Sequence, residues 1–250
     1  QLSEMHTVLL YERAGNGSSH SSKQIRTPYN IATELFGLLQ QTGCKKQITI
    51  LAHSQGALYA QQFARLYPER VKAVILLDPL SANDNQFKNA LTKTEYRKSG
   101  ADKSIGLYVN FILSCLHLEN MIKKVMHSAP PFCYYHDYSN EAADYILSCL
   151  TRPKVYKAAI DEYRQAHDDN AVSGLKERDG FPQIPLYLIT HTSEIATQGI
   201  MDFGGLKHDE AQKIENVWQT LMQEYLSFSD KALFTQAQHS NHYIHLTDTD

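Results

Sequence analysis

The feature that most constrains the fold is a strand, a turn and a helix that follow one another without a gap. Residues 47–52 (QITILA) form an apolar run of strand length, and residues 57–67 have the apolar spacing of a helix. Only the turn His53-Ser54-Gln55-Gly56 joins them. A serine on such a turn has its hydroxyl exposed at the carboxyl edge of a sheet, and the small residues beside it let helix and strand approach closely. Ser54 is therefore a candidate nucleophile.

Further apolar runs and helical patterns alternate along the chain. Strands are predicted at residues 7–11 (TVLLY), 71–77 (VKAVILL), 185–190 (PLYLIT) and 231–235, and helices at residues 28–42 and 209–226. Strands that alternate with helices form parallel sheets with right-handed crossovers. We expect an α/β fold in which helices flank a mostly parallel sheet.

The pattern changes between residues 79 and 183. Helical stretches at 106–126, 142–150 and 155–167 are interrupted by Pro130-Pro131, and no comparable strand-like run occurs. We therefore expect a core of residues 1–78 and 184–250, with a helical lid of residues 79–183 inserted between two strands.

The order of the polar residues favours catalysis by Ser54, although a serine beside a glycine can also be a simple helix cap. An acidic residue, Glu194, follows the strand at 185–190, and His242 follows the strand at 231–235. Nucleophile, acid and histidine in this order suit hydrolysis on this topology. Asp78, at the end of strand 71–77, is the alternative acid. Asp78-Pro79 can also simply end the strand by turn chemistry. Glu194 is preferred because the loop in which it lies is the commoner source of the acid in this order of residues. The backbone N–H of Gln55, at a helix N-terminus, is suited to hold an oxyanion.

Four blocks of the chain resemble the α/β-hydrolase fold: LLYERAGNGSS, ILAHSQGALYAQQFARLYPERVKAVILLDP, IPLYLITHTSE and HSNHYIHL. The resemblance covers both flanks of the predicted core but not the lid. It implies Ser54 as nucleophile, His242 as general base and then acid, and Glu194 as the carboxylate that orients the imidazole, with Asp78 as the alternative. Haloalkane dehalogenases and epoxide hydrolases have Asp in place of the serine, so the resemblance favours an acyl-enzyme on Ser54.

The implied function is a serine hydrolase that needs no cofactor and cleaves a carboxylic ester of a small or medium hydrophobic acyl group. A thioesterase, an amidase or aminopeptidase and a carbon–carbon bond hydrolase use the same triad. A noncatalytic binding protein of this fold is the alternative from another class. Apolar residues of the lid either line an acyl pocket or form the lid's own core: Phe111, Ile112, Leu113, Leu116, Leu118, Tyr134, Tyr135, Tyr138 and Tyr145.

The histidines near His242 and Ser54, and the glycine-rich loop at residues 12–17, are not assigned a catalytic role. His239, His242 and His245 do not have the spacing that points three imidazoles at one metal ion, and no Cys or carboxylate cluster completes a ligand set. We expect His53 to pack under the turn. The loop at residues 12–17 (ERAGNG) resembles a structural loop of the family, with Glu where Asp is usual.

The net charge and the cysteine spacing argue against other classes of function. Lys and Arg total 24 against 27 Asp and Glu, a net charge of −3, which leaves no basic field for nucleic acid or an anionic membrane. The four cysteines form no C-x-x-C pair, so we expect reduced thiols and favour the cytoplasm.

In the sheet of the family, a strand that precedes residues 7–11 in sequence lies between the strands at residues 7–11 and 47–52, and no such strand occurs in this sequence. Residues 1–6 have the pattern of the end of the helix that would follow it. The loop after that strand supplies a second oxyanion donor in the family. We therefore expect this sequence to be a fragment that lacks the first strands.

Overall fold

The computed structural model describes residues 2–134 and 139–248. It divides the chain into two compact units. The sheet unit contains Arg26–Ile105 and Glu162–Asp250, and the helical unit contains Gln1–Ile25 and Gly106–Asp161.

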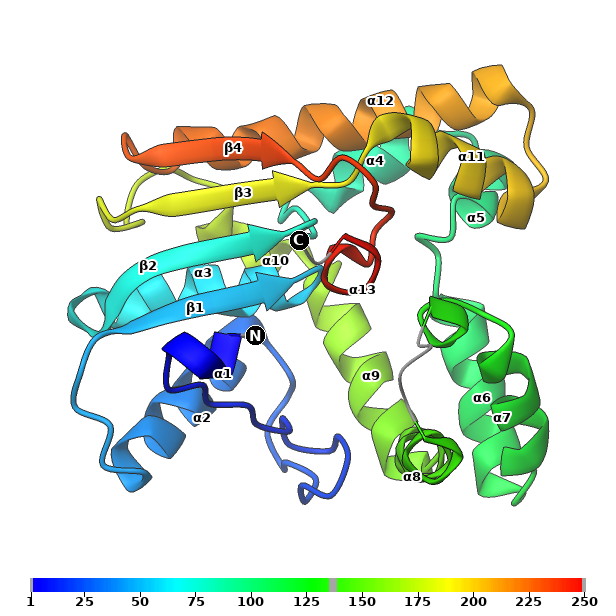
Figure 1. The fold of residues 1–250 in the computed structure, drawn as a ribbon, viewed down its shortest axis with the longest axis horizontal. Helices are drawn as coiled ribbons and strands as arrows, with labels where there is room; N and C mark the ends of the chain where they lie inside the picture. The colour runs from blue at the N-terminus through cyan, green and yellow to red at the C-terminus, as the bar shows by residue number, and fades with distance from the viewer. Residues whose placement is uncertain (1, 135–138, 249–250) are drawn as a thin grey trace. The chain divides into compact units, whose positions relative to one another are not determined.

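Four parallel strands form the sheet, in the order β1 (Ile48–His53), β2 (Val71–Leu77), β3 (Leu186–Thr190) and β4 (Ala232–Gln236) (Figure 1). Each occupies a stretch that the sequence predicts as a strand. β2 is apolar along almost its whole length because its neighbours and the packed helices cover both of its faces. The predicted fold class, a parallel sheet flanked by helices, is confirmed.

The helices of the sheet unit include three that begin and end close to those expected at residues 28–42, 57–67 and 209–226, and others that the sequence did not predict. They are α2 (Pro28–Gln41), α3 (Gly56–Leu66), α4 (Asp84–Ala90), α5 (Lys93–Lys98), α10 (Asp169–Val172), α11 (Ser193–Gly204), α12 (His208–Gln223) and α13 (Ile244–Thr247), with 3₁₀ turns η1 (Pro68–Arg70), η3 (Ser173–Leu175) and η4 (Glu224–Ser227). Thr27 caps α2, because its side chain accepts a hydrogen bond from the Asn30 N–H, and Pro28 occupies the first helical position.

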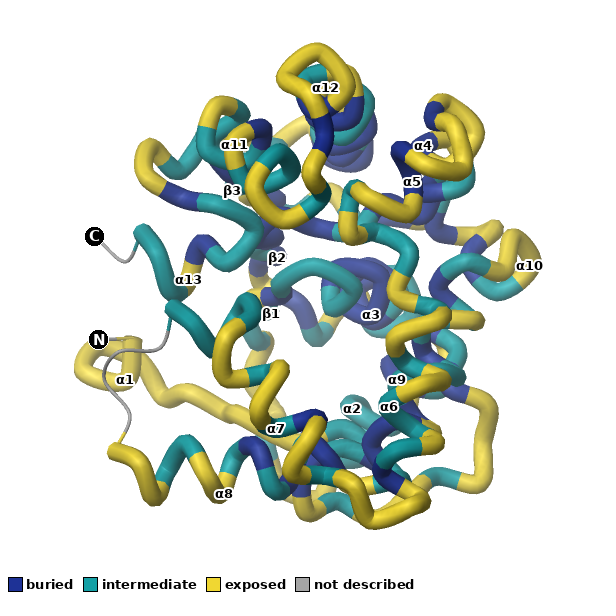
Figure 2. The backbone as a smooth tube through the Cα atoms, turned by 90° about the vertical axis from the view of Figure 1, so that its right-hand side faces the viewer, coloured by how far each residue is buried: buried dark blue, intermediate teal, exposed yellow. Residues whose placement is uncertain are grey.

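The core of the sheet unit lies between the sheet and its helices. α3 contacts β1 and β2, α2 packs on α3, and η4 contacts β3 and β4. Leu76 of β2 and Leu188 of β3 belong to the same buried cluster as Phe63 of α3 and Met222 of α12. The backbones of β2 and α3 are accordingly among the most buried parts of the chain (Figure 2).

The helical unit contains α1 (Leu2–Met5), α7 (Glu119–His127), η2 (Phe132–Tyr134), α8 (Asn140–Leu150) and most of α6 (Ser104–Cys115) and α9 (Pro153–Ala166). The single helix expected at residues 106–126 is two helices, because His117 has a φ of 58° and its left-handed backbone ends α6. In the glycine loop, the Glu12 carboxylate accepts a hydrogen bond from the Ser18 N–H at 2.6 Å, and Gly15 has a φ of 89°. These contacts give the loop the structural role that was expected.

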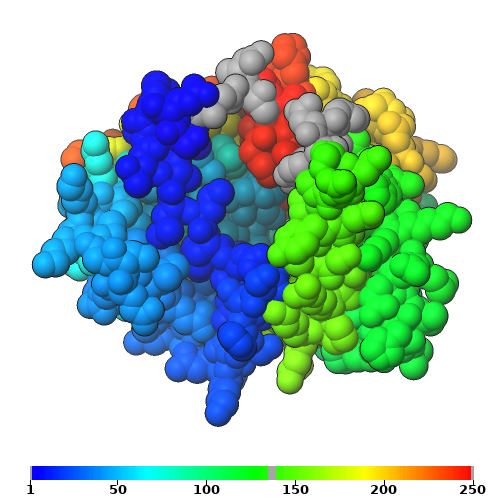
Figure 3. Space-filling view, turned by 60° about the horizontal axis from the view of Figure 1, so that its bottom comes forward, coloured from blue at the N-terminus to red at the C-terminus, as the bar shows by residue number. Residues whose placement is uncertain are grey.

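The boundaries of the two units differ from the predicted core and lid. Residues 79–105 and 162–183 group with the sheet, and residues 1–25 group with the inserted helices. The strand predicted at residues 7–11 is wrong: this stretch has no ladder partner and its apolar side chains are exposed, Leu10 at 88%. An apolar run becomes a strand only when a neighbouring strand satisfies its backbone N–H and C=O groups. Among the described residues, β1 lies at the edge of the sheet and pairs with β2 and with no other strand, so residues 7–11 do not extend the sheet. The space-filling view shows the first residues, in dark blue, at the surface (Figure 3).

The apolar residues assigned to the lid are not a buried core of the helical unit. Ile112, Leu116, Leu118 and Tyr145 are exposed, and Phe111, Leu113 and Tyr134 are half-buried. Tyr135 and Tyr138 lie outside the described residues. The buried apolar side chains of this unit include Ile122 and Leu147 instead.

Two other expectations can be compared with the described residues. All four cysteines are free thiols, as expected. Within residues 2–134 and 139–248, none of the helices has the length and apolar character needed to cross a bilayer.

The central strand should contribute more to stability than the edge strand. Leu76→Ala should lower the free energy of unfolding by about 2–5 kcal/mol, because it leaves a cavity among fully buried side chains. Leu233→Ala in β4 removes a side chain that is 60% exposed and should cost less than about 1 kcal/mol. Urea unfolding monitored by circular dichroism measures both, and equal losses would contradict this assignment of the core.

Candidate active site

Two neighbouring strands deliver Ser54 and Asp78 to the same edge of the sheet. His53 ends β1 and lies opposite Leu77, which ends β2. The residues that follow these two strands, Ser54 and Asp78, therefore leave the sheet at the same level. Ser54 has a φ of 53° and Asp78 a φ of 44°, a left-handed backbone that is costly for residues other than glycine. Both strands therefore end in sharp turns, and the Ser54 N–H still donates to the Leu77 carbonyl at 3.1 Å.

His242 reaches these two residues from the loop between β4 and α13. Its Nε2 lies 3.1 Å from Oγ of Ser54, and its Nδ1 lies 2.5 Å from Oδ2 of Asp78. Figure 1 shows α13, in dark red, beside the carboxyl ends of β1 and β2. The hydroxyl can donate to Nε2 while Nδ1–H donates to the carboxylate, which is the tautomer that a general base requires.

Asp78 is a fully buried carboxylate with several donors. Its Oδ2 also accepts from Nδ1 of His191 at 2.7 Å, and its Oδ1 accepts from the backbone N–H of His191 at 3.3 Å. Burial by itself raises the pKa of Asp78, but the hydrogen bonds and charges of His191 and His242 hold that pKa well below its usual range. Asp78 is therefore ionised.

Glu194, the preferred acid of the sequence analysis, is not the partner of His242. The unexpected helix α11 begins at Ser193, and Glu194 lies exposed in its first turn. Among the described residues, no hydrogen bond or ion pair joins Glu194 to His242, and the carboxylate at Nδ1 is that of Asp78. The alternative acid is the one that the structure brings into the constellation.

Gln55 lies at the N-cap of α3, directly after Ser54. Its side-chain amide donates to the Tyr59 hydroxyl at 2.7 Å, so the side chain is held along the helix. Within the described part of the chain, its backbone N–H has no hydrogen-bond acceptor. A free N–H at the start of a helix is suited to an anionic oxygen.

His53 supports the loop that carries His242. Its Nε2–H donates to the backbone carbonyl of His242 at 2.7 Å, and burial lowers the pKa of His53 to about 4, so the ring is neutral. Its ring packs against those of His242 and Tyr243, and packing under the turn stays a prediction. His239 is exposed, and the His245 ring lies 4.7 Å from that of His53. Among the residues that the structure describes, no group of three or more His, Cys, Asp or Glu side chains has the arrangement of a metal site.

Sequence reasoning missed His191 and Glu215. His191 directly follows β3, and its ring bridges Asp78 and Oε2 of Glu215 on α12, which lies 2.9 Å from Nε2. Both residues left a signal: His191 is the first residue after a strand, and Glu215 is an acidic residue on the apolar face of its helix. Trp218, one turn further along α12, stacks on the His191 ring at 6.2 Å and meets the His242 ring edge-on.

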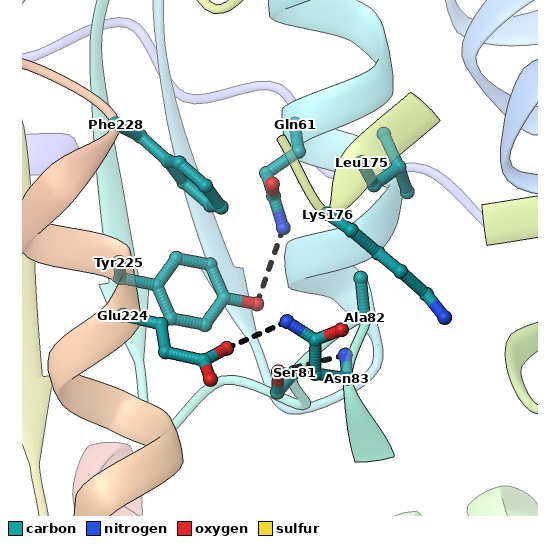
Figure 4. A pocket seen from close by; sticks show the side chains of 9 residues that line it. All are labelled: Gln61, Ser81, Ala82, Asn83, Leu175, Lys176, Glu224, Tyr225 and Phe228. Atoms are coloured by element: carbon teal, nitrogen blue, oxygen red, sulfur yellow. Dashed lines mark hydrogen bonds between the residues drawn. The ribbon is translucent and has the colours of Figure 1, made fainter. Parts of the chain in front are cut away.

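A hollow of about 180 Å³ lies elsewhere in the sheet unit (Figure 4). Its lining includes Gln61, whose amide donates to the Tyr225 hydroxyl at 3.2 Å, and Asn83, whose amide donates to Glu224 at 2.8 Å. The Tyr225 hydroxyl donates to the Leu80 carbonyl, two residues after Asp78. No member of the Ser54 constellation lines this hollow, so its polar contacts act by holding the loop that follows β2.

Comparison with known proteins gives a sequence match and a structural match. Residues 1–102 match a family model described as alpha/beta hydrolase fold. Over 100 residues the chain is 30% identical to abhydrolase domain-containing protein abhd-5.2 of Caenorhabditis elegans. That match covers 38% of this chain and 22% of the relative, so the chain spans about a fifth of the relative's length.

Solved structures match along almost the whole chain. A structure from a study of carboxylesterases of the thaumarchaeon Nitrososphaera gargenis has a TM-score of 0.56 at 15% identity and matches 94% of this chain and 72% of its own. MenH of S. aureus has a TM-score of 0.57 at 15% identity, covering 94% and 76% of the two chains. The epoxide hydrolase CorEH has a TM-score of 0.59 at 14% identity, covering 94% and 74%.

These structural likenesses concern the fold, while the sequence match covers the segment that contains Ser54 and Asp78. The parallel sheet and the strand, turn and helix around Ser54 agree with both. The chain has the α/β-hydrolase fold, and its residues 1–102 match the model of that family.

Proposed function

We propose that the protein is a serine hydrolase that cleaves a carboxylic ester through an acyl-enzyme on Ser54. The observation that carries the proposal is the hydrogen-bonded chain from Oγ of Ser54 to Nε2 of His242, at 3.1 Å, and from Nδ1 of His242 to Oδ2 of Asp78, at 2.5 Å. A nucleophile within reach of a base that is itself oriented by a third group is the arrangement that activates a serine.

In the acylation step, Oγ of Ser54 attacks the carbonyl carbon of the ester while Nε2 of His242 takes the hydroxyl proton. The ionised Asp78 stabilises the imidazolium that forms. The developing oxyanion accepts a hydrogen bond from the Gln55 N–H, aided by the dipole of α3. When the tetrahedral intermediate collapses, the alcohol leaves with the proton from His242.

In the second step, His242 takes a proton from a water molecule that attacks the acyl carbon. Collapse of the new intermediate releases the carboxylic acid, and Oγ of Ser54 recovers its proton from His242. The acyl group and the proton are both accounted for without a cofactor. Microscopic reversibility assigns His242 the roles of base and acid in each half of the cycle.

Two observations support the substrate class, and a third supports the compartment. Serine at the turn favours an acyl-enzyme over the alkyl-enzyme that an aspartate nucleophile would form. Carboxylesterases are among the proteins whose structures share this fold. The four free thiols support the cytoplasm as the compartment. A small ester with a hydrophobic acyl group is the substrate we propose, with thioesters and amino-acid amides as the comparison panel.

Covalent labelling tests the nucleophile directly. A fluorophosphonate probe should label Ser54, because an activated serine attacks the phosphorus while an ordinary serine does not. Peptide mass mapping should place the label on the peptide containing Ser54, and Ser54→Ala should abolish labelling. Ser227→Ala, which removes an exposed serine after α12, is the matched control and should label normally. A well-folded protein that does not label would favour a noncatalytic binding role.

The two candidate acids are separated by matched amide variants. Asp78→Asn should lower kcat/KM for the best ester by roughly 10²–10⁴-fold, because an amide cannot stabilise the correct tautomer and charge of His242. Glu194→Gln should change it by less than about twofold, since that side chain is exposed on α11. Steady-state ester hydrolysis with both variants gives the comparison. The reverse ranking would restore Glu194 as the acid.

A further inference from the structure

A second buried imidazole lies behind the proposed triad. His191 is 5% exposed and its two carboxylate partners are buried almost completely, Asp78 at 0% and Glu215 at 1%. Nδ1 of His191 lies 2.7 Å from Oδ2 of Asp78, and Nε2 lies 2.9 Å from Oε2 of Glu215. Burying three ionisable groups is costly unless they compensate one another.

The geometry determines the protonation of His191. Carboxylate oxygens only accept hydrogen bonds, so each ring nitrogen that faces one must carry a proton. A neutral imidazole would direct one lone pair at a carboxylate lone pair. Burial alone lowers the pKa of His191, but the hydrogen bonds and charges of Asp78 and Glu215 hold that pKa well above its usual value.

Other contacts fix this imidazolium in place. The side-chain amide of Gln219 donates to Oε1 of Glu215 at 2.7 Å, and that of Gln236 donates to the His191 carbonyl at 2.9 Å. The ring of Trp218 stacks on the His191 ring. Contributions from β3, β4 and α12 therefore leave the ring of His191 little freedom to turn.

The link to catalysis is a shared atom. Oδ2 of Asp78 accepts from Nδ1 of His191 at 2.7 Å and from Nδ1 of His242 at 2.5 Å. The cation on His191 is therefore one oxygen atom away from the base that we propose for Ser54. The donor on His191 therefore helps to fix the oxygen that orients the ring of His242.

We propose that His191, held as an imidazolium by Glu215, is a positioning residue that fixes Oδ2 of Asp78 against His242. The proposal rests on the function proposed above. It assigns a role in the reaction, through His191, to Glu215, which among the described residues forms no hydrogen bond or ion pair with Ser54 or His242.

The charges around His242 come from several elements. Asp78 follows β2, His191 follows β3, and Glu215 lies on α12. His53 at the end of β1 is neutral because burial lowers its pKa to about 4, and burial also lowers the pKa of His245 on α13. His191 is thus the buried cation next to the proposed base.

The first measurement uses the unaltered protein with ¹⁵N-labelled histidine. NMR should show both ring nitrogens of His191 protonated from about pH 5 to pH 8, a range over which ordinary histidines titrate. A His191 ring that is neutral at pH 7 would overturn the proposal. This result does not depend on any variant folding.

The second measurement uses His191→Asn/Glu215→Gln. The asparagine amide can still donate to Asp78, and the glutamine avoids leaving a buried carboxylate unpaired, so hydrogen bonds are retained while both charges are lost. The kcat for the best ester should fall by roughly tenfold or more with KM nearly unchanged, because Oδ2 of Asp78 is no longer fixed by the imidazolium toward Nδ1 of His242.

A matched control removes an exposed histidine and carboxylate from the same helix. In His208→Asn/Asp209→Asn, the lost pair is solvent-exposed and 3.7 Å apart, so kcat should not change. A folded His191→Asn/Glu215→Gln protein whose kcat equals that of the wild type would show that the pair is structural only and would overturn the proposal.

Fluorophosphonate labelling of the wild type separates the two proposals. Labelling at Ser54 together with an unchanged kcat in His191→Asn/Glu215→Gln would leave the serine hydrolase standing and remove the role of His191. A folded wild type that does not label would remove the proposed hydrolase, even if NMR shows both ring nitrogens of His191 protonated.

Discussion

A single buried oxygen, Oδ2 of Asp78, accepts hydrogen bonds from two imidazoles, and the arrangement of the site depends on it. A carboxylate with no exposed surface is strongly destabilised unless donors replace the lost water. Asp78 obtains those donors from His191, through its ring and its backbone, and from His242. The same donors that make burial of the charge tolerable also fix the ring that faces Ser54, so stability and chemistry draw on one set of contacts.

The parallel sheet explains why these residues meet. The carboxyl ends of β1, β2 and β3 lie at one edge, and the residue after each strand belongs to the network: Ser54, Asp78 and His191. α12 adds Glu215 and Trp218 one turn apart on its buried face. The loop after β4 brings His242 to the same edge. Ligands and reacting groups gather at the carboxyl ends of strands in open α/β sheets, and this chain follows that rule.

Much of the sheet unit could be predicted because its strands are continuous apolar runs bounded by turn residues. Ser54 and His242 could be predicted from the turn and from their order. The acid that pairs with His242 could not be predicted, because Asp78 and Glu194 both follow strands. The choice depends on α11, which begins at Ser193 and holds Glu194 in its first turn. Residues 7–11 have strand composition, but a strand also needs a partner that composition does not reveal. His191 and Glu215 could not be identified from the sequence, because they belong to the site only as a hydrogen-bonded pair and that contact is visible only in the structure.

The opposition of His53 and Leu77 in the β1–β2 ladder limits how this site can change during evolution. Because side chains alternate across a strand, inserting or deleting one residue in β1 or β2 would turn every following side chain to the other face of the sheet. Ser54 and Asp78 would then leave the sheet at different levels and point apart. Changes in the length of these two strands must therefore be matched.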